Sequence, residues 1–327
     1  MSLKEMMDAA EHSPEPRRRR RWLACGPLVL LLALVVVGGI ILFNKGKHLV
    51  NPIVEGCRAD TADGVVDLTL EQMQNASTIA AVATSRNLPE RAVTISLATA
   101  MQESRLRNLQ GGDRDSLGLF QQRPSQGWGT PAQIVDPVYA TNKFLDKLVK
   151  IPGYAQLPLT EAAQDVQKSG YPDAYAQHEP DATVLSGALS GRVASGLDCT
   201  VDGVGTATGT GELTAAVTKE FGKVAAPTVV AAAPSADAAS PGASGRRVVD
   251  VALRGARQTQ HGWAVAEWAV AHAKSLHLAS VGYAGQVWRA SASDKGWQAD
   301  PGTPANGPVR IEVAVAAASG VEASHSA

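Results

Sequence analysis

The sequence predicts a mainly α domain preceded by one N-terminal transmembrane helix and followed by a small α+β module. Three observations in the 327-residue chain support this fold class. A long uncharged apolar run lies near the N-terminus, helical periodicity fills the block between two cysteines, and a mixed strand and helix pattern follows a stretch rich in Gly, Ala, Ser and Pro.

The apolar run predicts a single membrane crossing. It extends from Leu23 to Phe43 without a charge, about the ~20 residues needed to cross a bilayer. The arginines Arg17 to Arg21 precede it, so the positive-inside rule places the N-terminus in the cytoplasm. We therefore expect a cytoplasmic basic tail at 1–21, a transmembrane helix at 22–44 in contact with the lipid bilayer, and all later residues outside the cell. The expected location is the cell membrane, in a single pass.

Composition limits the partners and the cofactors. The formal net charge of −1 gives no indication of nucleic-acid binding. No CxxC, HExxH or HxH spacing occurs, so neither a metal nor any other cofactor is predicted.

Cys57 and Cys199 fall in the part expected outside the cell, where an oxidising compartment permits a disulfide. Closing so long a loop would contribute roughly 4 to 5 kcal/mol in the chain-entropy model. Two unpaired buried thiols remain the alternative.

Residues 45–203 are predicted to form an all-helical extracellular domain. Thr69 and Gln72 have the spacing of a capping box, which marks the start of a helix. No strand pattern of comparable strength appears in this block. Further helix starts are expected at Pro89, Asp136, Thr160 and Pro180.

The composition changes after Gly203. Residues 204–245 are predicted to be a linker with one short helix. A small α+β module is expected at 246–315, followed by a disordered tail at 316–327. The expected elements of the α+β module are strands at 248–253 and 309–315 and a helix at 263–277.

Glu103 is the candidate catalytic residue. It is the first charge after an uncharged helical segment, Ala92 to Gln102. Desolvation favours the protonated form of a carboxyl group, and a Glu kept protonated near neutral pH can act as a general acid. The alternative is a carboxylate at a solvent-facing helix end, paired with Arg105 or Arg107.

The motifs around Glu103 resemble a known enzyme family. Glu103-Ser104 is followed, after a loop, by Gly-Leu-Phe-Gln at 118–121. This pattern resembles the lysozyme-like lytic transglycosylases, which have Glu-Ser and then Gly-Leu-Met-Gln at this interval, so Phe stands here for Met. The family's later tyrosine corresponds to either Tyr171 or Tyr175. The resemblance extends over about 70–189.

The resemblance implies cleavage of the β-1,4 bond between N-acetylmuramic acid and N-acetylglucosamine in peptidoglycan glycan strands. Glu103 would protonate the leaving oxygen and then deprotonate the C6 hydroxyl, with the substrate's acetamido group in place of a second carboxylate. Asp113 and Asp115 are the rival second carboxylates, or else plain turn residues. The substrate-binding candidates are Ser104, Gly118, Gln121, Gln122, Tyr171 and Tyr175.

The Gln121–Gln122 segment and Trp128 can each serve substrate binding or core packing. The segment that holds Gln121 and Gln122 is expected to contact sugar acetamido groups, to pack Leu119 and Phe120 into the core, or to do both, since the two residue types point to different faces. Trp128 either stacks on a sugar ring or fills the core.

The C-terminal module resembles a module of actinobacterial envelope proteins that is similar to zinc D,D-carboxypeptidase folds. The zinc ligands of such peptidases are missing, because Asp250 stands alone and the last strand begins Val309-Arg310-Ile311-Glu312. We expect a non-catalytic wall-binding or partner-binding module. The tryptophans Trp263, Trp268, Trp288 and Trp297 are expected in its core.

Two functions from different classes follow. The first is a membrane-anchored peptidoglycan glycosidase, either transglycosylase or hydrolase. The second is a non-catalytic, membrane-tethered wall-binding or scaffold protein.

Overall fold

The computed structural model describes residues 54–170, 172–230 and 245–316. The helical block begins and ends in one small antiparallel sheet of order β2-β1-β3. Its strands are β1 (Gly56–Thr61), β2 (Gly64–Leu68) and β3 (Leu197–Thr200). The prediction of an all-helical block is therefore wrong. These strands are short, so their own residues carry little periodic signal, and the Asp63-Gly64 pair at the hairpin is the main local sign of them.

The small sheet aligns the two cysteines. Cys57 and Cys199 are directly opposite each other in the β1–β3 ladder, and their Cα atoms lie 4.0 Å apart. The predicted disulfide between them is confirmed, and both residues are buried. It closes the two ends of the helical block.

Among the described residues between β2 and β3 there are six α-helices and two 3-10 helices, η1 (Pro124–Gln126) and η2 (Pro172–His178). The predicted capping box is confirmed, because the Thr69 hydroxyl accepts from the Gln72 backbone and the Gln72 side chain accepts from Thr69 N–H. The α-helices are α2 (Leu70–Ser85), α3 (Glu90–Ser104), α4 (Pro131–Ile134), α5 (Pro137–Leu148), α6 (Leu159–Gln167) and α7 (Glu179–Leu189).

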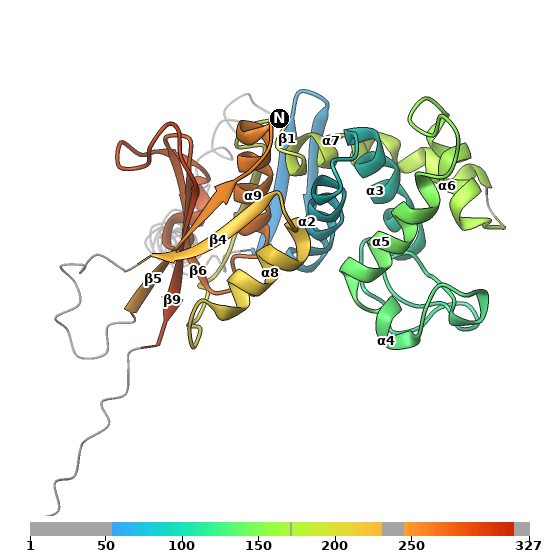
Figure 1. Cartoon of the computed structure of the whole chain (residues 1–327), viewed down its shortest axis with the longest axis horizontal. Coiled ribbons are helices and arrows are strands. Elements are labelled where there is room, and N and C mark those ends of the chain that lie inside the picture. The colour runs from blue at the N-terminus through green and yellow to red at the C-terminus, as the bar shows by residue number, and fades with distance from the viewer. Residues whose placement is uncertain (1–53, 171, 231–244, 317–327) are drawn as a thin grey trace, which may run out of the picture. The chain divides into compact units, whose positions relative to one another are not determined.

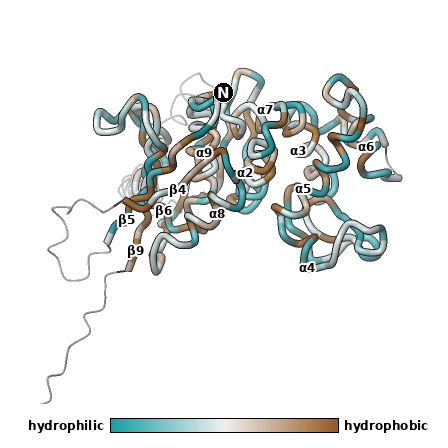
Figure 2. The backbone as a smooth tube through the Cα atoms, viewed as in Figure 1, coloured by the Kyte–Doolittle hydropathy of each residue, from teal (hydrophilic) through white to brown (hydrophobic). Residues whose placement is uncertain are grey.

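A second, larger antiparallel sheet follows, with the order β4-β5-β9-β6-β7-β8 (Figure 1). The hydropathy colouring shows apolar residues where β5 and β9 meet (Figure 2). The segment predicted as a linker holds α8 (Gly211–Phe221) and β4 (Ala225–Val230). The other elements are β5 (Gly245–Leu253), α9 (Gln258–Ala271), β6 (Leu278–Tyr283), β7 (Gln286–Arg289), η4 (Ala290–Lys295), β8 (Gln298–Ala299) and β9 (Val309–Val315).

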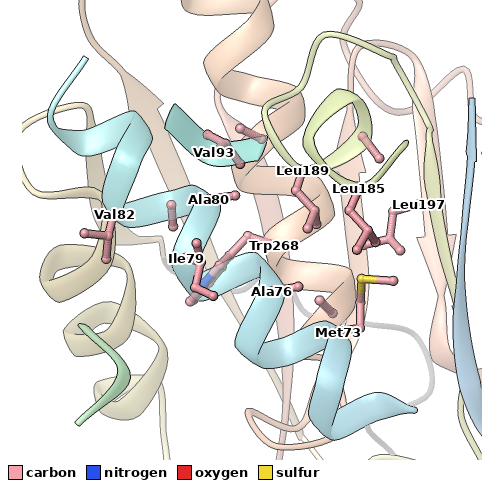
Figure 3. Packing of buried hydrophobic residues seen from close by; sticks show 14 of the residues in the cluster. Met73, Ala76, Ile79, Ala80, Val82, Val93, Leu185, Leu189, Leu197 and Trp268 are labelled. Carbon is pink, nitrogen blue, oxygen red and sulfur yellow. The ribbon is translucent and has the colours of Figure 1, made fainter. Parts of the chain in front are cut away.

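Helix α9 joins the larger sheet to the helical block. Every residue from His261 to Ala271 is buried, the polar His261 and Glu267 included, so this mostly apolar helix is covered on all its faces. Its neighbours include α2, α7, β3 and β6, and Trp268 lies beside Ile79 of α2 (Figure 3). The described residues after Pro52 accordingly cluster as one compact unit.

A glycine permits a close approach to α9. Gly191 has a φ of +70°, and a Cβ atom there would lie 2.0 Å from the carbonyl oxygen of Gln260. Any larger residue would push the end of α7 away from α9.

The predicted fold class needs correction. The chain is not mainly α, because strands β1 to β9 form two antiparallel sheets beside the helices. The predicted transmembrane helix lies outside the described residues, and within them no helix has the length and apolar character to cross a bilayer.

Candidate active site

Glu103 lies in the last turn of α3 and contacts a tyrosine from η2. The Tyr175 hydroxyl donates a hydrogen bond of 2.7 Å to Oε1 of the half-buried Glu103 carboxylate. The expected alternative pairing is not observed, since no described residue forms an ion pair with Glu103, and Arg105 and Arg107 are exposed. The carboxylate is thus oriented by a neutral donor.

Tyr175 is itself firmly placed. Its side chain is fully buried. Burial, followed by the negative charge of Glu103 and their hydrogen bond, raises the pKa of the Tyr175 phenol well above its ordinary value of 10.0. The Ser169 hydroxyl also hydrogen-bonds to the phenol. Tyr175 therefore stays protonated and remains a donor to Glu103 at neutral pH. Tyr171, the other candidate tyrosine, lies outside the described residues.

Ser104 ties the first motif to the second. Its buried hydroxyl lies 2.8 Å from the Leu119 carbonyl oxygen and 3.0 Å from that of Ala100, and it donates to both. Gly118 precedes this contact with a φ of +73°, and a Cβ there would lie 2.6 Å from the Ile134 carbonyl oxygen. Residues of the Glu-Ser and Gly-Leu-Phe-Gln motifs are therefore in direct contact.

The second motif forms a tight turn in which backbone bonds join Leu117 and Gln122 in both directions. Gln122 is buried and donates to the Ala140 carbonyl oxygen at 3.0 Å. Phe120 is buried and stacks on Phe144 with ring centroids 4.8 Å apart. These residues face the core. Gln121 is partly exposed, and its amide donates to Gly118 within the turn.

The two rival carboxylates have different surroundings. Asp115 accepts hydrogen bonds from Arg123 at 2.8 Å and from the backbone and hydroxyl of Ser125. The Arg123 contact, with the Ser125 bonds, holds the pKa of Asp115 far below its ordinary value. Asp113 is exposed, and its carboxylate lies 4.0 Å from Arg114. Asp115 thus shapes the loop rather than holding a proton.

A polar cluster beside Glu103 was missed by the sequence reasoning. The Gln102 side-chain oxygen lies 3.0 Å from Gln177 Nε2, which donates to it, and 3.0 Å from His178 Nε2. Burial lowers the pKa of His178, so its imidazole is neutral at neutral pH. With its proton on Nε2, His178 is a second donor to the Gln102 side-chain oxygen. The N–H groups of the Gln102 amide then point away from Gln177 and His178. Only the polar run AQH after Tyr175 signalled this cluster.

Trp128 belongs to the core. Its side chain is buried, and the Lys147 ammonium lies 3.2 Å from the ring centroid. The tryptophans of the C-terminal part are buried too, except for the partly buried Trp297, which packs against Trp263.

Asp250 and Arg310, which stand where related peptidases have zinc ligands, pair with each other. Asp250 accepts hydrogen bonds of 2.9 and 3.0 Å from Arg310 on the neighbouring strand. No group of three or more His, Cys, Asp or Glu side chains able to hold a metal occurs in the part of the chain that the structure describes.

Comparison with known proteins bears on the C-terminal part. A family model described as "VldE, C-terminal domain" matches residues 204–306. This range runs from before α8 to after β8 and covers less than half of the chain, outside the block that contains Glu103. The chain is similar to that domain over these residues. No curated protein matches the chain.

Proposed function

We propose that this protein is a peptidoglycan glycosidase of the lytic transglycosylase type, with Glu103 as the acid and base. The observation that carries the proposal is the 2.7 Å hydrogen bond from Tyr175 to Glu103 Oε1. It supports the proposal because a single carboxyl group that must give and then retake a proton needs a fixed orientation.

The proposed reaction uses no water. Glu103 gives its proton to the glycosidic oxygen as the bond from that oxygen to C1 breaks, and the substrate's acetamido oxygen attacks C1. Glu103 then removes the proton of the C6 hydroxyl, whose oxygen replaces the acetamido oxygen at C1 and closes a 1,6-anhydro ring. The engagement of Asp115 by Arg123 and Ser125 favours this single-carboxylate route over a two-carboxylate route.

The proposed substrate is consistent with the polar surroundings of Glu103. Sugar acetamido and hydroxyl groups are neutral hydrogen-bonding groups. Gln102 and Gln121 carry amides near the two motif segments, and both are partly exposed. We propose that these amides contact the glycan, and that Ser104 and Gln122 instead hold the turn in place.

The proposed location is outside the cytoplasm. The Cys57–Cys199 disulfide supports it, since such bonds persist in oxidising compartments. Turnover of purified sacculi by the full chain and by Glu103→Gln tests the function. A chain that binds sacculi without releasing fragments would instead be a non-catalytic scaffold.

A further inference from the structure

The larger sheet carries a positively charged hollow on its surface. The hollow has a volume of about 640 Å³ and lies where α8 ends, β4 begins and β5 has just ended. Its charged lining residues are Lys219, Lys223 and Arg254, and none of the described residues that line it is acidic. The chain as a whole has a net charge of −1, so this concentration of positive charge is local.

Two of the three cations are uncompensated. Lys219 Nζ lies 2.8 Å from Asp136 Oδ2 of the α5 cap, which neutralises it. Lys223 and Arg254 form no ion pair with any residue that the structure describes. Both are exposed. Positive charge without a partner, at the wall of a hollow, favours an anionic ligand.

The backbone around these cations is fixed. Arg254 N–H donates to the Val224 carbonyl oxygen at 2.9 Å, and the buried His261 side chain of α9 hydrogen-bonds to the Arg254 backbone. Lys219 lies in the last turn of α8, and Lys223 follows directly after the Gly222 cap of that helix. The backbone positions that carry these side chains are therefore fixed before a ligand binds, which lowers the entropic cost of binding.

The residue types indicate which anion fits. A guanidinium presents a planar fork of N–H groups that matches two phosphate oxygens, and an ammonium adds a compact point charge. Ala225, Ala226 and Pro227 supply an uncharged wall. We propose that this hollow binds a phosphate group through Lys223 and Arg254. The site is separate from Glu103 and does not depend on the proposed glycosidase activity.

Calorimetric titration of the full chain with inorganic phosphate and with linear polyphosphate tests this site. Arg254→Gln and Lys223→Gln should each weaken binding at least about tenfold, as expected for a charge-assisted contact. Lys150→Gln is the matched control, because Lys150 is also exposed and without an ion pair among the described residues; it should change the affinity less than about twofold.

The two probes distinguish the source of the phosphate. Saturable binding of inorganic phosphate with this pattern of variants indicates a free phosphate ligand, and binding of polyphosphate alone indicates a polymer. Equal losses in all three variants would mean unspecific electrostatic attraction and overturn the proposal. So would the absence of saturable binding of either probe by the unmodified chain.

Discussion

The Tyr175 hydroxyl donates to Glu103 Oε1 at 2.7 Å although the two residues lie 72 positions apart. The contact joins the end of α3 to η2 and directs one carboxylate oxygen toward the protein. No hydrogen bond from a described residue reaches the other oxygen, Oε2. That oxygen is therefore the one we expect to exchange the proton with the substrate.

Tyr175→Phe tests this orientation. The ring remains, but the hydrogen bond to a charged acceptor, typically ~1.5–3 kcal/mol, is lost. We expect kcat on purified sacculi to fall about 10- to 100-fold with a smaller change in KM. Tyr283→Phe is the control, because its hydroxyl donates to the backbone oxygens of Gln258 and Thr259 in α9. An unchanged kcat for Tyr175→Phe would remove the tyrosine from the mechanism.

Ser104→Ala tests the tie between the two motifs. The variant leaves the Leu119 carbonyl without its side-chain donor, so the free energy of unfolding should fall by about 1–3 kcal/mol. Ser85→Ala is the control, because Ser85 donates within its own helix, to Val82. Urea denaturation measures both. Equal small losses would show that the Ser104 contact does not stabilise the turn.

The disulfide should stabilise the whole unit. Replacing both Cys57 and Cys199 by Ser removes the cross-link of a long loop and should lower the free energy of unfolding by about 2–5 kcal/mol. Peptide mapping without reductant should find the pair linked in exported protein. Two free thiols there would contradict the structure.

A buried carboxyl group and a partly buried one near it should make stability depend on pH. Burial, and then the nearby Asp198, raises the pKa of Glu267 well above its ordinary 4.5, and burial raises that of Asp198. The folded chain therefore holds these protons more tightly than the unfolded chain. This contribution to stability is complete below about pH 4.5 and is lost as the pH rises toward the folded pKa values.

Glu267→Gln removes one of these titrating groups. Its side-chain oxygen can still accept from the Gly196 N–H, as Glu267 Oε1 does at 2.8 Å. Thermal denaturation between pH 5 and about 8 should show a flatter curve for the variant and a higher melting temperature than the unmodified chain at the alkaline end. Parallel curves would refute the assignment.

The sequence predicts elements with strong local signals and misses those fixed by tertiary contacts. The Thr69–Gln72 box and the strand Val309–Val315 are found where expected. The strand β3 has only four residues and pairs with β1 far away in sequence, so its own residues carry little signal. The mostly apolar helix α9 is indistinguishable in sequence from a module's own core helix, yet it packs against α2.

The candidate site was predictable in part. The Glu103-Ser104 motif and its interval to Gly118 were visible in the sequence, and the structure brings these segments together through Ser104. The inward direction of Gln122 was not visible, because an amide that donates to the Ala140 carbonyl has the same sequence signal as one that contacts a sugar. The choice of a tyrosine beside Glu103 likewise needed the geometry of η2.

Release of fragments from purified sacculi by the full chain and by Glu103→Gln tests the central claim most directly. The amide keeps the volume of the side chain but cannot exchange a proton, so the rate should fall by at least about 10²-fold while binding to sacculi is retained. The products of the unmodified chain should end in 1,6-anhydro-muramic acid, which mass spectrometry separates from hydrolysis products by one water. Equal rates for the two proteins, or no release by the unmodified chain, would contradict the glycosidase function and leave a wall-binding scaffold.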